Sequence, residues 1–123
     1  LPLFSQSADV AGSAQKRSIQ IMPLGDSMTF GSPDRDYGGY RRLLGTLLTS
    51  DGEAIDFVGS QRSGNGVIPD PDNEGHPGWT IAEIKSGIDS KGWLETYRPD
   101  IILLCWYAGT SGEWAFRSRN RRE

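Results

Sequence analysis

The stretch SIQIMPLGDSMTFG, residues 18–31, decides how the rest of the chain is interpreted. Its first part alternates apolar and other side chains well enough to predict a β-strand over residues 18–24, with Ile19, Ile21 and Pro23 on one side. Pro23 stands near the end of this strand, where a missing N–H is tolerated. Residues 25–27 then form a tight turn, which places Ser27 just beyond the end of a strand.

Apolar side chains downstream recur with helical and strand periods. A helix is predicted over residues 39–50, and a capping box formed by Thr80 and Glu83 begins a second helix over residues 80–97. The apolar face of the first helix is expected to consist of Tyr40, Leu43, Leu44, Leu47 and Leu48. The remaining segments comprise strands at 54–59 and 100–106 and a long polar loop at 60–78. The apolar run at 101–106 is typical of a strand covered on both faces, but one edge and part of both faces are expected to be open in this chain.

Alternation of strands and helices favours an α/β fold with a parallel sheet. The first strand is expected at the centre, between the second and the third, in the 2-1-3 order of flavodoxin-like sheets. Ligands of open α/β sheets bind beyond the carboxyl ends of the strands. Residues 25–27 and 109–111 both follow apolar strands, so both are expected at that edge.

Length and charge restrict the class of partner. A chain of 123 residues is enough for one small domain, and its net charge of -3 argues against a nucleic-acid partner, because phosphate binding needs a basic face. No apolar stretch reaches the length of a membrane span, so no membrane partner is expected. Residues 113–123 are arginine-rich and are interpreted as a solvated basic tail. The sequence does not indicate an oligomeric state.

Several ordered segments together closely resemble the conserved blocks of the SGNH/GDSL hydrolase superfamily, in particular its carbohydrate-esterase branch, which includes acetyl xylan esterases. These segments are residues 21–31, 32–35, 39–44, 56–60, 73–81 and 99–104. The resemblance implies a three-layer α/β/α, flavodoxin-like domain with a parallel sheet, here truncated after about three strands. It divides the chain into a leader or disordered segment at 1–17, a partial esterase domain at 18–112 and a tail outside the family at 113–123.

The resemblance also assigns roles to residues. Ser27 would be the catalytic nucleophile and its own N–H an oxyanion donor, and Gly78, within GHPGWT at 75–80, would supply a second N–H. The family usually has an oxyanion-binding Asn where this chain has Ser111. Its catalytic Asp and His come from an Asp-x-x-His block that this sequence lacks. The only histidine, His76, lies in another block, so a structural or substrate-contacting role is favoured for it over that of a base.

The function expected is therefore that of a serine-dependent carboxylic-ester hydrolase, without cofactor or metal, acting on a small-molecule or polysaccharide ester. The full-length form would be a polysaccharide deacetylase-type esterase and this chain impaired or inactive. The family and the small residues at 11–14 favour a secreted protein. A frame or splice error in the gene is the favoured explanation of why residues 105–123 depart from the family.

Two alternatives remain open from the residues themselves. Short Gly-Asp-Ser strings are common in ordinary turns, and Gly78 fits a turn glycine as well as an oxyanion donor. A different function is a non-catalytic flavodoxin-like module that binds an anionic ligand such as a flavin phosphate, since Ser27, Thr29 and Ser32 offer hydroxyls beside a glycine-rich loop. That function lacks the support of a Walker-type lysine or a G-x-G-x-x-G motif.

Overall fold

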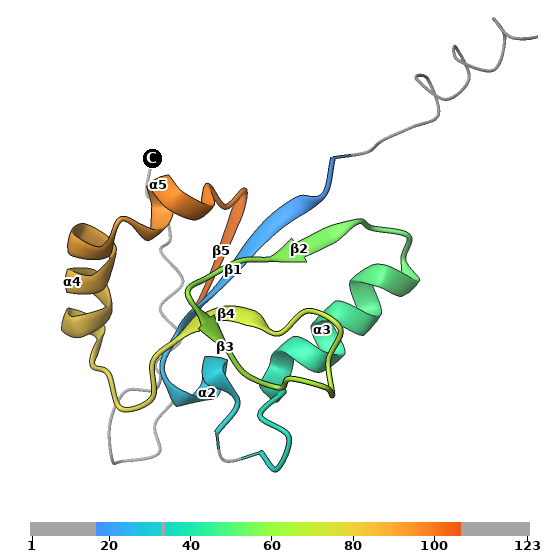
Figure 1. Ribbon diagram of the computed structural model, residues 1–123, viewed down its shortest axis with the longest axis horizontal. Coiled ribbons are helices and arrows are strands. Elements are labelled where there is room, and N and C mark those ends of the chain that lie inside the picture. The colour runs from blue at the N-terminus through green and yellow to red at the C-terminus, as the bar shows by residue number, and fades with distance from the viewer. Residues whose placement is uncertain (1–16, 33, 107–123) are drawn as a thin grey trace, which may run out of the picture.

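The computed structural model describes residues 17–32 and 34–106. Most of the expected leader, the whole basic tail and residues 109–111 therefore lie outside the described residues. The elements in chain order (Figure 1) are β1 Ile19–Gly25, α2 Ser27–Phe30, α3 Gly39–Ser50, β2 Ile55–Phe57, β3 Gln61–Arg62, β4 Asp72–Gly75, α4 Ile81–Lys91, α5 Trp93–Tyr97 and β5 Ile101–Cys105.

Strand β1 is the centre of the sheet, and the predicted 2-1-3 order is confirmed. β5 pairs in parallel with residues 21–25 of β1, while the opposite edge of β1 pairs with β2 at residues 19–21 and with β4 at residues 24–25. β2 must therefore leave this edge before β4 joins it. Gly59 lies at that crossing, where an added Cβ would be 2.1 Å from the carbonyl oxygen of Asn73.

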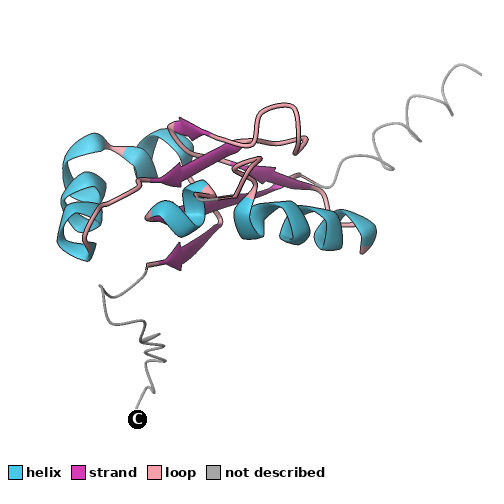
Figure 2. Ribbon diagram, turned by 90° about the horizontal axis from the view of Figure 1, so that it is seen from below, coloured by secondary structure: helices cyan, strands magenta, loops and turns pink. Residues whose placement is uncertain are grey.

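Helices cover both faces of the sheet (Figures 1 and 2), as the α/β/α prediction requires. On one face, Met22 and Leu24 of β1 pack in a buried cluster with Ile84 of α4 and Trp93 of α5. The other face carries Phe57, whose ring lies against Gly45 of α3. β1 thus supplies apolar side chains to the layer formed by α4 and α5, and β2 supplies Phe57 to the layer formed by α3.

The polar loop predicted at 60–78 is wrong in part, because β3 and β4 lie within it and pair antiparallel to each other. β4 shows no apolar alternation, yet Asn73 and Glu74 are fully buried. Their polar atoms are satisfied internally: Glu74 accepts hydrogen bonds from the N–H and the hydroxyl of Ser60, and Asn73 donates to the hydroxyl of Ser63. A strand stabilised in this way leaves no hydrophobic period in the sequence.

The helix predicted over residues 80–97 is divided at Gly92. The capping box at Thr80 is confirmed, but α4 ends where Gly92 adopts a left-handed conformation with φ of 66°. α5 begins at the next residue and directs Trp93 back against α4, where an added Cβ on Gly87 would meet the indole ring at 2.4 Å. Gly87 therefore allows this close packing.

One expectation about apolar surface is wrong for the described residues, and one is confirmed. Leu43 and Leu47 of α3 are 63% and 56% exposed, and the buried residue of this helix is Arg41. On β5, the exposed fractions of Ile102 and Leu104 are 43% and 56%, as expected for an apolar strand whose faces are partly open in this chain. In the described part of the chain, β5 pairs with β1 along one edge and with no other strand.

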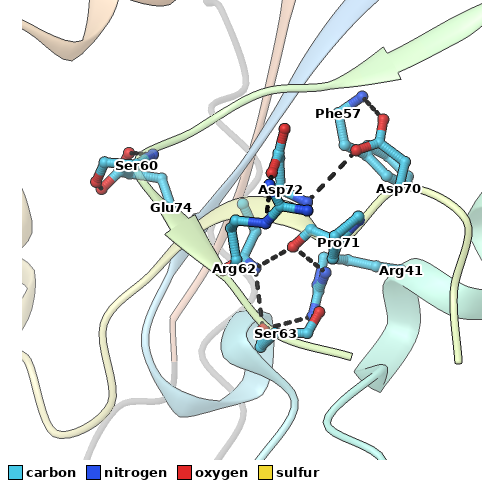
Figure 3. A network of polar contacts seen from close by, with 10 residues as sticks. Arg41, Phe57, Ser60, Arg62, Ser63, Asp70, Pro71, Asp72 and Glu74 are labelled. Atoms are coloured by element: carbon cyan, nitrogen blue, oxygen red, sulfur yellow. Dashed lines mark hydrogen bonds and ion pairs between the residues drawn. The ribbon is translucent and has the colours of Figure 1, made fainter. Parts of the chain in front are cut away.

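Arg41 occupies the interior because it joins the segments around it. Its guanidinium donates hydrogen bonds to carbonyl oxygens of residues 29, 30, 37, 63 and 71 and to the Ser63 hydroxyl, at 2.8–3.2 Å. Figure 3 shows Arg41 between Ser63 and Pro71. The side chain is 1% exposed, and burial lowers its pKa. One cation thus connects α3 to the end of α2, to the following loop and to the segment that precedes β4.

Replacing Arg41 by Met should lower the free energy of unfolding by at least about 3 kcal/mol, because buried carbonyl groups lose their donor. Urea denaturation followed by tryptophan fluorescence measures this change, and a variant that does not fold at all meets the same expectation. The matched control is Arg42→Met, since Arg42 is exposed and forms its one ion pair within the described residues with Asp36; a change within about 1 kcal/mol is expected. Equal effects of the two substitutions would contradict the role given to Arg41.

Candidate active site

Ser27 is the first residue of a one-turn helix that begins directly beyond β1. The carboxylate of Asp26 caps this helix by accepting a hydrogen bond from the N–H of Met28 at 3.0 Å. Gly31, with φ of 101°, ends the turn and donates its N–H to the carbonyl oxygen of Ser27 at 2.8 Å. The tight turn predicted at residues 25–27 is therefore present, and it places Ser27 at the carboxyl edge of the central strand.

The hydroxyl and the backbone N–H of Ser27 have no hydrogen-bond partner in the described part of the chain. The residue is half-buried, and neither its N–H nor its hydroxyl makes a hydrogen bond with a described residue. A backbone N–H at the start of a helix carries partial positive charge and favours anions. Ser27 therefore offers a hydroxyl and an N–H to a bound ligand.

The segment that contains Gly78 is joined directly to the same strand end. Gly75 is the register partner of Gly25, and the N–H of His76 donates to the carbonyl oxygen of Gly25 at 2.8 Å. A turn follows, in which the N–H of Trp79 donates to the carbonyl oxygen of His76 at 3.1 Å. Gly78 has φ of +82°, and Pro77 precedes it, which is the residue pattern of a type II turn. The structure thus brings the two predicted site segments together.

Gly78 itself is exposed, and its N–H makes no hydrogen bond with a described residue. An added Cβ would meet no atom within 4 Å, so the described neighbours leave space beside it. The positive φ explains the glycine as a turn residue. The unused N–H is also what an oxyanion donor requires, so the two interpretations of Gly78 are compatible.

Two glycines allow the elements around Ser27 to approach closely. A Cβ on Gly25 would lie 1.8 Å from the carbonyl oxygen of Cys105 in β5. A Cβ on Gly75 would lie 2.4 Å from the backbone nitrogen of Phe30 in α2. No larger residue fits either position without displacing backbone. The contacts between β1, β4, β5 and α2 therefore depend on these glycines.

A hydrogen bond between two hydroxyl groups connects α2 to α3. Thr29 is fully buried, and its hydroxyl lies 3.3 Å from that of Tyr40 in α3. Burial is the main cause that raises the pKa of Tyr40 to about 12. The hydroxyl of Thr29 is thus committed to the interior, and the flavodoxin-like alternative keeps only the hydroxyls of Ser27 and Ser32.

His76 belongs to a buried network. Its Nε2 lies 2.6 Å from a carboxylate oxygen of Glu74, which also accepts from Ser60. The imidazole stacks on Trp79, with ring centroids 3.9 Å apart, and on Trp93 at 5.0 Å. These contacts agree with the structural role favoured for His76. Glu74 was not among the residues predicted for the site. Its position two residues before His76 was the only sequence feature that could have indicated a contact between the two side chains.

No group of three or more potential metal-ligating side chains occurs among residues 17–32 and 34–106. In the same part of the chain, no helix has the length and apolar character needed to cross a membrane. Ser111, expected in place of a third oxyanion donor, lies outside the described residues.

The chain is similar in sequence and structure to known esterases. No family model matches the chain. It is 33% identical over 124 residues to a multidomain esterase of Ruminococcus flavefaciens, covering 85% of this chain and 15% of that protein. Among solved structures, a family 3 carbohydrate esterase of Clostridium thermocellum is 52% identical with a TM-score of 0.67, over 72% of this chain and 43% of that chain.

Two further structures are similar. One is a serine-to-alanine mutant of an acetyl esterase with an acetate ion, 33% identical with a TM-score of 0.58 over 72% of this chain and 42% of that chain. The other is a family 3 carbohydrate esterase of Talaromyces cellulolyticus, 34% identical with a TM-score of 0.56, over 70% and 42%. The chain spans less than half the length of each of these relatives. The resemblance to carbohydrate esterases and the α/β fold class are confirmed.

Replacing Gly75 by Ala should destabilise the protein by about 1–3 kcal/mol, because the new methyl group would overlap the backbone of Phe30. The matched control is Gly45→Ala, whose Cβ would lie 3.4 Å from the Phe57 ring and which gains helix propensity. Thermal unfolding should show a lower midpoint for the first variant and an unchanged or higher midpoint for the second. A midpoint for Gly75→Ala at or above that of the wild type would refute the close packing of β4 on α2.

Tyr40 should make the stability fall at alkaline pH. Its pKa is about 12 in the folded protein and 10.0 ordinarily, so the neutral phenol is favoured by folding. Its contribution is complete below about pH 10 and is lost as the pH rises toward 12. Tyr40→Phe should therefore unfold with a shallower pH dependence over this range in urea titrations. Parallel curves for the two proteins would show that Tyr40 is not protected by burial.

Proposed function

We propose that this chain is the N-terminal part of a carbohydrate esterase of the SGNH type, with Ser27 as its nucleophile. The substrate proposed is an acetyl ester of a polysaccharide. Similarity to carbohydrate esterases and to an acetyl esterase described with an acetate ion supports this class of substrate. A polysaccharide substrate in turn supports an extracellular location for the protein.

One observation supports the proposal most strongly. The hydrogen bond from His76 to Gly25 joins the turn containing Gly78 to the strand that ends at Ser27, and the N–H groups of Ser27 and Gly78 both remain unused by described residues. An ester carbonyl oxygen becomes negatively charged when a nucleophile adds to its carbon. Two fixed N–H donors at that position stabilise the charge, and each is typically worth about 10²–10³-fold in rate.

The reaction proposed has two steps. The hydroxyl oxygen of Ser27 forms a bond to the acyl carbon, and its proton passes to a base. Collapse of the tetrahedral intermediate breaks the ester bond, and the base returns the proton to the leaving sugar oxygen. Water then attacks the acetyl-Ser27 ester and releases acetate. Through both steps the N–H groups of Ser27 and Gly78 hold the oxyanion.

The base is proposed to lie outside residues 1–123. His76 is the only histidine of the sequence, and its Nε2 contacts Glu74 while its ring is stacked against two indoles. Serine without a base is a weak nucleophile. Ser111, where the family has Asn, would be a poorer donor. Hydrolysis by this chain alone is therefore proposed to be slow.

The nucleophile is tested in a chimera in which residues 17–106 replace the matching segment of the Clostridium thermocellum relative. Ser27→Ala should lower kcat/KM for a short acetyl ester at least about 10³-fold, because the covalent step is lost. The matched control is Ser50→Ala, which removes a hydroxyl from the exposed end of α3 and should stay within about tenfold of the parent. Equal activity of the parent and Ser27→Ala would refute the role of Ser27.

A further inference from the structure

A groove of about 640 Å³ opens beside the end of α2, on the side of the loop that leads to α3. This volume lies within the range of small-molecule sites. Its wall includes the aromatic rings of Phe30 and Tyr37, the guanidinium groups of Arg35 and Arg62, and Ser63. Ser32 also lines it, and the N–H of Ser32 donates to the carbonyl oxygen of Ser27 at 3.0 Å. The groove therefore borders the last residue of α2, the one-turn helix whose first residue is Ser27, and Ser27 itself is not part of its wall.

Tyr37 is held in this wall in an unfavourable backbone conformation. Its φ is +56°, a region that bulky residues rarely adopt. The conformation is maintained by neighbours. The carbonyl oxygen of Tyr37 accepts a hydrogen bond from Arg41 at 2.8 Å, and its N–H donates to the backbone carbonyl oxygen of Asp34 at 3.2 Å. The ring gains little burial in return, because the residue is 46% exposed. Its ring packs edge-on against that of Phe30, with the ring centroids 5.9 Å apart. Strain of this kind is characteristic of ligand sites.

The two arginines of the groove have unused binding capacity. Arg35 is exposed and makes no hydrogen bond or ion pair with a described residue. Arg62 forms a long ion pair with Asp72, in which its Nε lies 3.6 Å from a carboxylate oxygen. Asp36, the acidic residue of the groove wall, is occupied by Arg42 and by the N–H of Gly38.

A third cation lies beneath the groove. Arg41 donates to Ser63, which forms part of the wall, and all of its hydrogen-bond acceptors are neutral. The buried guanidinium adds positive potential at the nearby surface, and Asp70, which interacts with Arg41 electrostatically without a hydrogen bond to it, reduces that potential. The groove therefore combines an exposed aromatic ring with positive charge.

We propose that this groove is a subsite for an acidic sugar unit, a uronic acid, of the polysaccharide substrate. Its carboxylate would bind Arg35 and Arg62, since guanidinium groups match carboxylates in geometry and charge. The apolar face of its ring would pack on Tyr37. The assignment rests on the proposed function, because it takes the ester held at Ser27 and the acidic unit to belong to one carbohydrate chain.

Binding to the chain itself tests the subsite without using catalysis. Calorimetric titration compares an oligosaccharide containing glucuronic acid with the same oligosaccharide after reduction of its carboxyl group to an alcohol. The acidic form should bind at least tenfold more tightly. Arg35→Gln should abolish most of this preference, whereas Lys85→Gln, which removes a positive charge from the exposed face of α4, should preserve it. Equal affinity for the two sugars, or equal loss in both variants, overturns the proposal.

Tyr37→Gly separates the ring from the fold. Glycine adopts the positive φ freely, so this variant should remain folded with an unchanged or higher melting temperature. It should nevertheless bind both oligosaccharides at least fivefold more weakly. Undiminished binding by a folded Tyr37→Gly protein overturns the role of the ring. Failure of Ser27→Ala to reduce hydrolysis would refute the role of Ser27 as nucleophile and leave these binding results unchanged, so the two proposals fail separately.

Discussion

The buried guanidinium of Arg41 is the interaction on which the arrangement of this protein depends. A charged group at 1% exposure is expensive to desolvate, and no carboxylate is hydrogen-bonded to it. Carbonyl oxygens from α2, from the loop before α3 and from the segments beside β3 and β4 replace its water instead. None of these segments contributes a residue to the buried cluster of Met22, Leu24, Val58, Ile84 and Trp93. They are held in place by converging on one donor group, which links residues far apart in the sequence.

The position of Ser27 follows from that convergence and from close backbone packing. The guanidinium of Arg41 donates hydrogen bonds to the carbonyl oxygens of Thr29 and Phe30, so α3 is joined to the helix that begins at Ser27. Gly75 lets β4 lie against the other side of the same helix. The hydrogen bond between His76 and Gly25 then places the turn containing Gly78 beside the strand end. Each contact involves backbone atoms, which suits a site whose proposed chemistry uses N–H donors fixed before the substrate arrives.

The sequence predicts the parts of this structure that depend on apolar periodicity or on turn chemistry. β1, the order of the parallel strands, the capping box at Thr80 and the turn before Ser27 all carry such patterns. The parts that it does not predict are polar. β4 is buried through hydrogen bonds of Asn73 and Glu74, and α3 turns Arg41 inward and leaves Leu43 exposed, which reverses a pattern based on hydrophobicity. A buried polar network is defined by partners distant in the sequence, so no local period reveals it. Of the candidate site, residues 25–27 and 75–78 were found through turn glycines and family resemblance. The network around His76 was not.

The central claim is that the N–H groups of Ser27 and Gly78 form one anion-binding position, and the most direct measurement is an NMR titration of the ¹⁵N-labelled chain with acetate. Acetate carries the carboxylate that the proposed reaction releases and needs no catalytic base to bind. The account predicts that the amide signals of Ser27 and Gly78 shift together and saturate at a common dissociation constant, while exposed glycine amides distant from the site, such as that of Gly52, do not move. Signals of Ser27 and Gly78 that stay fixed, or that shift with unrelated dissociation constants, would contradict it.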